Sequence, residues 1–246
     1  MENLLKYLFP PKCIFCDSEG EVFCDTCLAE CSLLTAQYCL VCDLPSEGGF
    51  THTQCAERLR GTAPSRLICV YTYDGKVREC IKFSKYGAKQ FLSLRKLCRE
   101  AADVCAEMWS GITPDLCLPI PSSPKKLSYR GFNQANMIAE EFSNKFKLSL
   151  NKELLIRVRN TEAQHTRDRE GRQENVKGSF AVTAPARIKE KKILLVDDIS
   201  TTGATFLESA KVLYAAGAAE VQCFALSKRE KPWRVGRAVM QRLAKP

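Results

Sequence analysis

Two adjacent carboxylates, Asp197 and Asp198, follow an apolar run and directly precede a turn rich in hydroxyls and glycine. The apolar run, residues 193–196, predicts a buried strand, and residues 204–216 predict a helix. Such a turn presents backbone N–H groups and hydroxyls at a helix N-terminus, which is a favourable site for a phosphate dianion. Because the two carboxylates repel that phosphate, we expect them to face sugar hydroxyls or a magnesium ion.

One ligand class combines a 5-phosphate, a diol and magnesium over this distance, namely phosphoribosyl pyrophosphate (PRPP). We predict that Asp197 and Asp198 hold the ribose hydroxyls and that the turn holds the 5-phosphate. The residues expected to surround that phosphate are Ser200, Thr201, Thr202, Gly203, Ala204 and Thr205. An ordinary strand–turn–helix with an N-cap threonine would explain one threonine, but not the paired carboxylates.

A cationic loop, residues 125–134, enters another predicted helix. Arg130 can offer a planar fork to pyrophosphate oxygens, and Lys85 adds a second positive charge. Asn133 and Gln134 offer amides close to the helix N-terminus. We therefore predict that Arg130 and Lys85 offset the charge of the pyrophosphate and that the two amides lie beside it.

Residues 159–178 form a long polar stretch without apolar periodicity. Loops of this length inside compact domains are usually functional lids or disordered segments. The residues that we assign to a lid are Arg159, Thr161, Gln164, Arg172 and Asn175. The alternative is a solvated surface loop without a role at the site.

Eight cysteines lie within the first 55 residues, most of them as Cys-x-x-Cys pairs. Two ligands at this spacing grip one metal ion, and two such pairs complete a tetrahedron. The sequential assignment gives one zinc ion the ligands Cys13, Cys16, Cys24 and Cys27. It gives a second zinc ion the ligands Cys39, Cys42, His52 and Cys55. Closed sites of this kind stabilise a fold and imply no catalysis.

The spacing leaves several points open. An interleaved cross-brace would use the same eight ligands. His52 stands where a ribbon usually has a cysteine, and a lone histidine in a loop is often just exposed. Cys31 fits neither set and is either a spare thiol or an alternative ligand. The other six cysteines are scattered along the chain, and we predict that they are small buried hydrophobes.

The composition of the 246 residues, 45% hydrophobic and 26% charged, is that of a globular protein. No apolar run approaches the roughly 20 residues that cross a bilayer, and no signal peptide is recognisable, so we expect no membrane span and a cytoplasmic location. The formal net charge of +9 is uneven, because residues 1–60 carry −5 and residues 61–246 carry +14. A basic body suits phosphate ligands, nucleic acid or both.

Predicted strands and helices alternate after a linker at residues 61–64, which divides the chain into a module of residues 1–60 and a domain of residues 61–246. The predicted strands are 66–73, 116–120, 154–158, 180–182, 193–196 and 221–226, and the predicted helices are 76–85, 90–108, 133–147 and 204–216. This alternation indicates an α/β fold, a mainly parallel sheet with helices on both faces. Ligands bind at the carboxyl ends of such strands, where Pro121 and Asp197 lie.

The order of the motifs extends the argument over nearly the whole chain. The acid pair followed by Thr-Thr-Gly-x-Thr resembles the PRPP-binding motif of type I phosphoribosyltransferases. A cysteine-rich finger, Tyr-Asp-Gly at 73–75, Pro-Ile-Pro at 119–121, Arg-Gly-Phe-Asn-Gln at 130–134 and this motif follow one another. The whole arrangement resembles the competence protein ComF family. The resemblance implies a type I phosphoribosyltransferase-like domain behind a double zinc ribbon.

The resemblance also implies association with the uptake of transforming DNA in bacteria, with single-stranded DNA or a competence helicase as partners. The expected cofactors are one or two structural zinc ions, with magnesium accompanying PRPP. One alternative is a single-stranded nucleic-acid-binding module that keeps a non-catalytic phosphate pocket and uses the basic tail with Trp233. Another is a nucleobase salvage phosphoribosyltransferase. An amidotransferase is disfavoured, because metal ligands fill the first 60 residues where a glutaminase domain would be needed.

Overall fold

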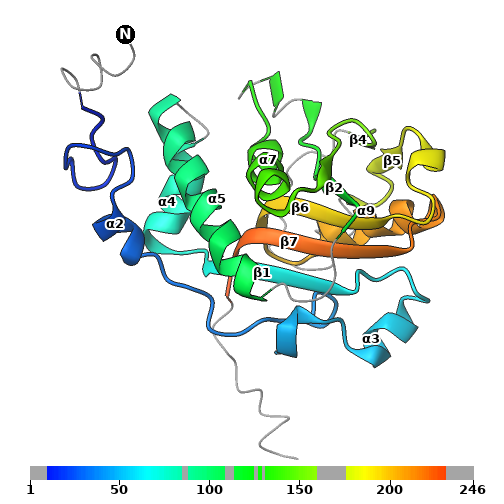
Figure 1. Ribbon diagram of the computed structural model, residues 1–246. Helices are drawn as coiled ribbons and strands as arrows, with labels where there is room; N and C mark the ends of the chain where they lie inside the picture. Colours follow the sequence, from blue (N-terminus) through cyan, green and yellow to red (C-terminus); the bar gives the residue numbers. More distant parts are fainter. Residues whose placement is uncertain are drawn as a thin grey trace, which may run out of the picture.

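The computed structural model describes residues 10–84, 88–108, 114–124, 127–128, 131–159 and 176–230. A five-stranded parallel sheet with strand order β1-β7-β6-β2-β3 lies at its centre (Figure 1). The strands are β1 (Arg66–Thr72), β2 (Leu116–Pro119), β3 (Ser149–Leu150), β6 (Lys192–Ser200) and β7 (Glu220–Lys228). The predicted parallel sheet is therefore confirmed.

Alternating side chains along each strand feed two cores, one on each face of the sheet. In β6, Leu194 and Val196 belong to the first core, and Ile193 and Leu195 belong to the second. Helices cover both faces, as the alternation predicted. The helices of the first face are α4 (Gly75–Phe83), α5 (Ala88–Met108) and α7 (Gln134–Phe146), and that of the second face is α9 (Ala204–Ala215).

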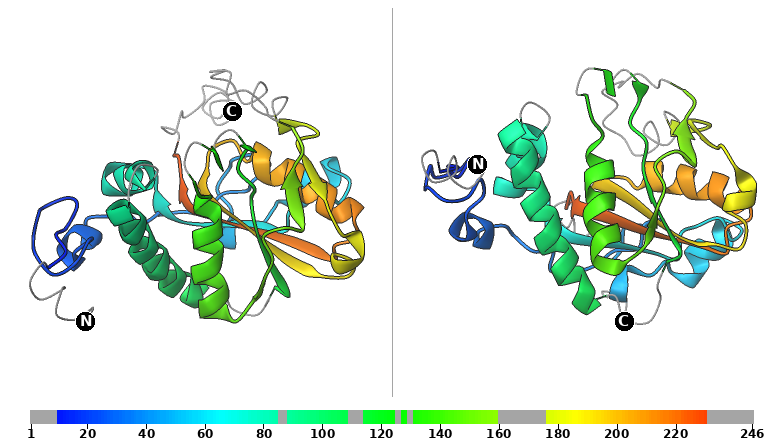
Figure 2. Two further views of the ribbon diagram at one scale, coloured as in Figure 1. Left: turned by 90° about the horizontal axis from the view of Figure 1, so that it is seen from above. Right: turned by 45° about the horizontal axis from the view of Figure 1, so that its top comes forward.

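Helices α5 and α7 run side by side above the sheet (Figure 2). The Glu141 carboxylate of α7, buried between the helices, accepts ion pairs from Arg95 and Arg99 of α5. The six scattered cysteines are buried in the two cores, which confirms the prediction that they act as small hydrophobes. Burial raises the pKa of Cys69 and Cys117 to about 12, so both stay neutral thiols.

Two of the predicted strands do not join the parallel sheet. β4 (Leu155–Arg157) and β5 (Phe180–Val182) pair with each other, antiparallel, as a separate two-stranded sheet packed against α9. Each has three residues, and the core side chains Leu155 and Phe180 hold the pair on the second face. Strand β6 is also longer than predicted, since its ladder with β7 continues as far as Ser200. Pairing with a neighbouring strand therefore overrides the weak strand preference of aspartate.

The N-terminal segment packs against the body at two separate places. Helix α2 (Asp25–Ala29) lies beside α4 and α5, whereas α3 (Thr53–Arg58) lies close to β1 (Figure 1). Between them, Leu33 forms a bridge with Tyr71 along the edge strand β1. Two short 3-10 helices, η1 (Glu47–Gly49) and η2 (Pro185–Arg187), complete the elements in the described residues. This packing covers the edge of β1, which would otherwise expose unpaired backbone groups.

None of the helices in the described ranges combines the length and apolar character that a membrane span requires.

Candidate functional site

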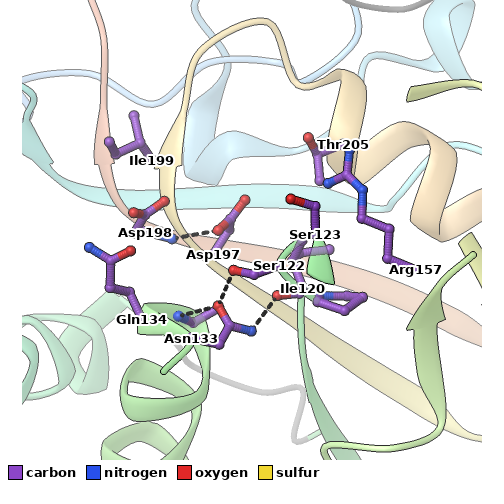
Figure 3. A pocket seen from close by; sticks show the side chains of 12 residues that line it. Ile120, Ser122, Ser123, Asn133, Gln134, Arg157, Asp197, Asp198, Ile199 and Thr205 are labelled. Carbon is purple, nitrogen blue, oxygen red and sulfur yellow. Dashed lines mark hydrogen bonds between the residues drawn. The ribbon is translucent and has the colours of Figure 1, made fainter. Parts of the chain in front are cut away.

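Polar side chains line a cavity of about 250 Å³ at the carboxyl ends of β2 and β6 (Figure 3). The cavity is bordered by the segment after β2, the start of α7, the end of β4, the acid pair and the start of α9. The lining residues are Ile120, Pro121, Ser122, Ser123, Asn133, Gln134, Ala135, Arg157, Asp197, Asp198, Ile199 and Thr205. The site lies at the edge of the sheet that the sequence predicted.

Both carboxylates of the acid pair lie inside β6 and reach this cavity half-buried. The backbone N–H of Asp198 donates to Oδ1 of Asp197 over 2.9 Å. This hydrogen bond ties the Asp197 carboxylate to the backbone of β6, the strand from which both acids of Figure 3 come. Two acceptor groups placed together in this way suit vicinal hydroxyls or a divalent cation.

The turn after β6 brings a helix N-terminus to the same cavity. Gly203 is the N-cap of α9 in the left-handed conformation, with φ +75°, and the side chain of Thr205 lines the cavity. The Ala204 N–H donates to Oγ1 of Thr202 over 3.4 Å. Of the predicted phosphate ligands, the threonines at 201, 202 and 205 are half-buried, whereas Ser200 is buried within β6 with 2% of its surface exposed. The turn thus offers threonine hydroxyls and helix N–H groups to an anion.

The two predicted amides are bound within the protein. Oδ1 of Asn133 accepts from the Ser122 hydroxyl over 2.9 Å, and its Nδ2 donates to the Ile120 carbonyl over 2.9 Å. Nε2 of Gln134 donates to the Ile81 carbonyl over 3.0 Å, so it ties the start of α7 to α4. In this geometry the amides position the segments that border the cavity, and their direct contact with phosphate stays a prediction.

A first set of four cysteine sulfurs, Cys13, Cys16, Cys24 and Cys27, gathers within 4.8 Å of one another. The Sγ atoms of Cys16 and Cys24 are 3.6 Å apart, close to the roughly 3.8 Å edge of a zinc–sulfur tetrahedron with bonds of about 2.3 Å. Burial raises the pKa of Cys27 to about 12, whereas hydrogen bonding from the Cys27 backbone lowers the pKa of Cys24 to about 6. The set fits a structural zinc ion.

The second set, Cys39, Cys42, His52 and Cys55, meets the same distance limit. Nδ1 of His52 lies 3.3 Å from Sγ of Cys42, and Nε2 lies 3.2 Å from the Pro45 carbonyl. A metal-bound histidine commonly donates its other ring N–H to a backbone carbonyl, which fixes the ring. His52 is therefore oriented as a ligand, and both sets follow the sequential grouping.

Cys31 lies outside both sets. Its thiol donates to the Cys27 carbonyl over 3.9 Å, and burial raises its pKa to about 11. Of the two readings that the sequence left open, the geometry favours a spare buried thiol that packs beneath the first set.

Comparison with known proteins matches both parts of this architecture. Residues 4–57 match the double zinc ribbon domain, and residues 128–245 match the phosphoribosyl transferase domain. Competence protein ComFC of Bacillus subtilis is 27% identical over 241 residues, with 87% of this chain and 93% of that protein aligned. The chain therefore combines a double zinc ribbon with a phosphoribosyl transferase domain, and over most of its length it is similar to competence proteins of the ComF family. DNA utilization protein YhgH of Escherichia coli K12 is 29% identical, and the match covers 77% of this chain and 83% of that protein. Competence protein F of Haemophilus influenzae is 28% identical, and the match covers 47% of this chain and 51% of that protein.

The structure adds Arg157 to the cavity, a residue that the sequence analysis placed in the predicted strand 154–158 and did not assign to the site. Its guanidinium lies over the Phe180 ring, 5.4 Å from the centroid, and its Nε donates to the Arg159 carbonyl over 3.3 Å. Burial lowers the pKa of Arg157, and the Asp197 carboxylate opposes that shift. Arginine remains protonated in proteins, so Arg157 brings a positive charge to the site.

Several residues predicted for the site lie outside the described residues, so their roles stay predictions. They are Lys85, Arg130, Thr161, Gln164, Arg172 and Asn175. Arg159, the first residue of the predicted lid, is exposed at the end of the β4 segment. It stands next to the cavity through its carbonyl contact with Arg157.

The turn at residues 201–205, which we predict to hold the phosphate and call the phosphate turn, has a stability test at Gly203, since a Cβ there would lie 2.5 Å from Cδ1 of Leu40. We expect Gly203→Ala to lower the free energy of unfolding by about 2–4 kcal/mol, from left-handed strain and overpacking together. Gly61 is the matched control, because its φ is +72° and a Cβ would meet nothing within 4 Å. Urea unfolding should show a loss of about 1 kcal/mol for Gly61→Ala. Equal losses in the two variants would contradict the close packing at Gly203.

Proposed function

We propose that this protein binds PRPP with magnesium in the cavity between β2, β6 and α9. The observation that carries the proposal is the meeting of two carboxylates, a helix N-terminus and a guanidinium in one cavity. Asp197 and Asp198 would accept hydrogen bonds from the ribose hydroxyls. The turn with Thr201, Thr202 and Thr205 would bind the 5-phosphate. This division follows charge, because a carboxylate attracts hydroxyl donors and a helix N-terminus attracts an anion.

If the protein turns PRPP over, the reaction is displacement of pyrophosphate from the anomeric carbon by a nucleobase or related acceptor. The bond from that carbon to the pyrophosphate oxygen breaks with its electron pair leaving on pyrophosphate, and the positive charge that develops is shared with the ring oxygen. Asp197 and Asp198 orient the ribose and stabilise that charge, while Arg157 offsets the negative charge of the leaving group. Bound magnesium would supply further charge neutralisation on substrate oxygens. No enzyme nucleophile is required.

The experiment that separates an enzyme from a binding module is pyrophosphate release across a panel of nucleobases. Release with at least one base, and its loss in Arg157→Gln, would assign turnover to this site. PRPP binding without release for any base would assign a binding module that has kept the phosphate pocket. Either result identifies the class of protein, because binding and release are measured on the same preparation.

For the N-terminal segment we propose two structural zinc ions with the sequential ligand sets. Four protein ligands in each set leave no position for substrate, as in other structural sites. Such thiolate sites persist in reducing compartments, so a cytoplasmic location remains our prediction.

We further propose that the protein acts on the DNA-handling side of competence, as the names of its relatives suggest for them. The positive charge of residues 61–246 is the property of this chain that supports the proposal. Single-stranded DNA should bind with an affinity that falls steeply with salt, because each neutralised phosphate releases counterion. A competence helicase remains a second possible partner implied by the family.

The C-terminal residues give this proposal its test. We expect removal of residues 231–246 to flatten the slope of log affinity against log salt, because five Lys and Arg residues are lost, and to leave PRPP affinity unchanged. Filter binding at several salt concentrations measures the slope. If the truncated, folded protein keeps the full slope, the tail does not contact DNA and serves as packing, in line with its apolar i, i+4 spacing.

A further inference from the structure

The second metal-ligand set lies directly behind the phosphate turn. Leu40 stands between the ligands Cys39 and Cys42 and is 5% exposed. It packs so closely on Gly203 that a Cβ there would come within 2.5 Å of Leu40 Cδ1 and 3.1 Å of the Leu40 carbonyl oxygen. The loop of the second set, residues 39–44, is therefore in direct contact with the phosphate turn.

Two more contacts join the same two segments. Leu207, in the first turn of α9, packs against the small core formed by Cys39, Val41 and Cys55. At the other end of this loop, Asp43 accepts an ion pair of 2.6 Å from Lys228, which is 5% exposed at the end of β7. Ladder pairing places Lys228 opposite Ser200, the last residue of β6 before the turn. The loop thus contacts the elements on both sides of the turn, α9 through Leu207 and β7 through Lys228.

A small number of backbone contacts shape this loop, among them a bridge between Tyr38 and Pro45. Its backbone closes through Asp43 N–H to the Cys39 carbonyl and Cys39 N–H to the Leu44 carbonyl, both 2.9 Å. Two of the ligands, Cys39 and Cys55, form its small core together with Val41 and Ala63, and a third ligand, Cys42, packs against that core. A four-coordinate metal ion would fix this arrangement, because binding of the metal ion and folding of the loop are coupled.

We propose that the second metal set holds the phosphate turn in place. Metal on Cys39, Cys42, His52 and Cys55 then favours anion binding at Thr201–Thr205. Leu40 is the positioning residue that transmits the effect. Coupling between two sites is reciprocal, and typical couplings change affinity by about 5- to 150-fold. The part of the proposal that concerns PRPP rests on the proposed function, whereas the part that concerns the rigidity of the turn does not.

The first metal set provides the contrast. It lies beside α4 and α5, where Lys96 pairs with Glu21 and Asp25 and Lys76 lies over the Phe15 ring (Figure 1). These contacts stabilise the helices that cover the first face of the sheet. Gly203 and Leu207 instead contact Leu40 and the small core of the second set.

The test is amide hydrogen exchange of residues 201–205 in His52→Ala, measured without PRPP, after metal analysis has shown the loss of one zinc ion per chain. We expect exchange in the turn to become at least about tenfold faster, while the amides of α7 keep their protection and report an intact fold. Unchanged exchange in the turn after loss of that zinc ion would overturn the proposal. Should His52→Ala fail to fold, Leu40→Ala in the zinc-loaded protein asks the same question.

The leucine variants come with matched controls. Leu40→Ala should speed exchange in the turn, and Leu40→Met should restore protection because it refills the volume. Leu44→Ala, in the same loop but 53% exposed, should leave exchange unchanged. Equal effects of Leu40→Ala and Leu44→Ala would overturn the assignment of Leu40 as the positioning residue.

The PRPP arm distinguishes this proposal from the proposed function. We expect PRPP affinity with magnesium to fall about tenfold in His52→Ala. Faster exchange in the variant, with no PRPP binding even in the wild-type protein, would support the effect of the second metal set on the turn and reject PRPP as the ligand. Equal PRPP binding in both proteins, with unchanged exchange, would support PRPP as the ligand and reject the effect of the second metal set on the turn.

Discussion

Asp197→Asn combined with Asp198→Asn is expected to abolish the stabilisation of the protein by PRPP. A ligand at about 100 times its dissociation constant raises the free energy of unfolding by about 2.7 kcal/mol, which corresponds to a rise of roughly 5–10 °C in melting temperature for a domain of this size. The two amides keep the shape of the side chains but lose the negative charge that attracts hydroxyl protons and magnesium. The measurement is the melting temperature with and without PRPP and magnesium.

A pair of exposed carboxylates on the helices of the first face gives the matched control. Glu79→Gln with Asp103→Asn removes the same total charge at positions away from the cavity and should keep the full shift. A variant of the acid pair that still shows the wild-type shift would contradict the placement of ribose beside Asp197 and Asp198. Loss of the shift in both double variants would instead indicate a response to net charge.

Metal removal is expected to have the second large effect. The purified protein should hold about two zinc ions per chain, and a chelator should lower its melting temperature by about 10 °C or more. The reason is structural, because Cys13 and Cys27 belong to the first core and Leu40 belongs to the second. The ribbon is therefore part of the body's packing, and its loss destabilises more than the first 60 residues.

Single substitutions make this prediction specific. Cys39→Ser should reduce the zinc content to about one per chain, as measured by atomic emission. Cys31→Ser is the matched control, since Cys31 is a buried cysteine outside both ligand sets, and its zinc content should stay at about two. Zinc content well below one in the wild-type protein, or a melting temperature that does not respond to the chelator, would contradict the account.

Local patterns in the sequence predicted most of the sheet, because apolar runs of strand length stand between turn signals at 66–73 and 193–196. They could not predict that β4 and β5 form a separate sheet, since three residues are too few to specify which strand they pair with. The same limit explains the end of β6. Its ladder with β7 extends through the acid pair, and that ladder depends on residues more than 25 positions away.

The chemistry of the site divides in the same way. The acid pair and the threonine turn are contiguous in sequence, so their residue types and order were sufficient to place Asp197, Asp198 and Thr205 at one edge of the sheet. Arg157 reaches the cavity because β4 pairs with β5, which packs against α9, and no spacing rule predicts that approach. Leu40 and Gly203 are 163 positions apart, so their contact became visible only in three dimensions.

The central claim is that PRPP binds where β6 meets α9, and equilibrium dialysis of labelled PRPP tests it most directly. Zinc-loaded protein with magnesium should bind about one PRPP per chain in a saturable manner, and excess unlabelled PRPP should displace it. Asp197→Asn with Asp198→Asn should bind none under the same conditions. A folded, zinc-loaded wild-type protein that binds no PRPP at millimolar concentration would contradict the account.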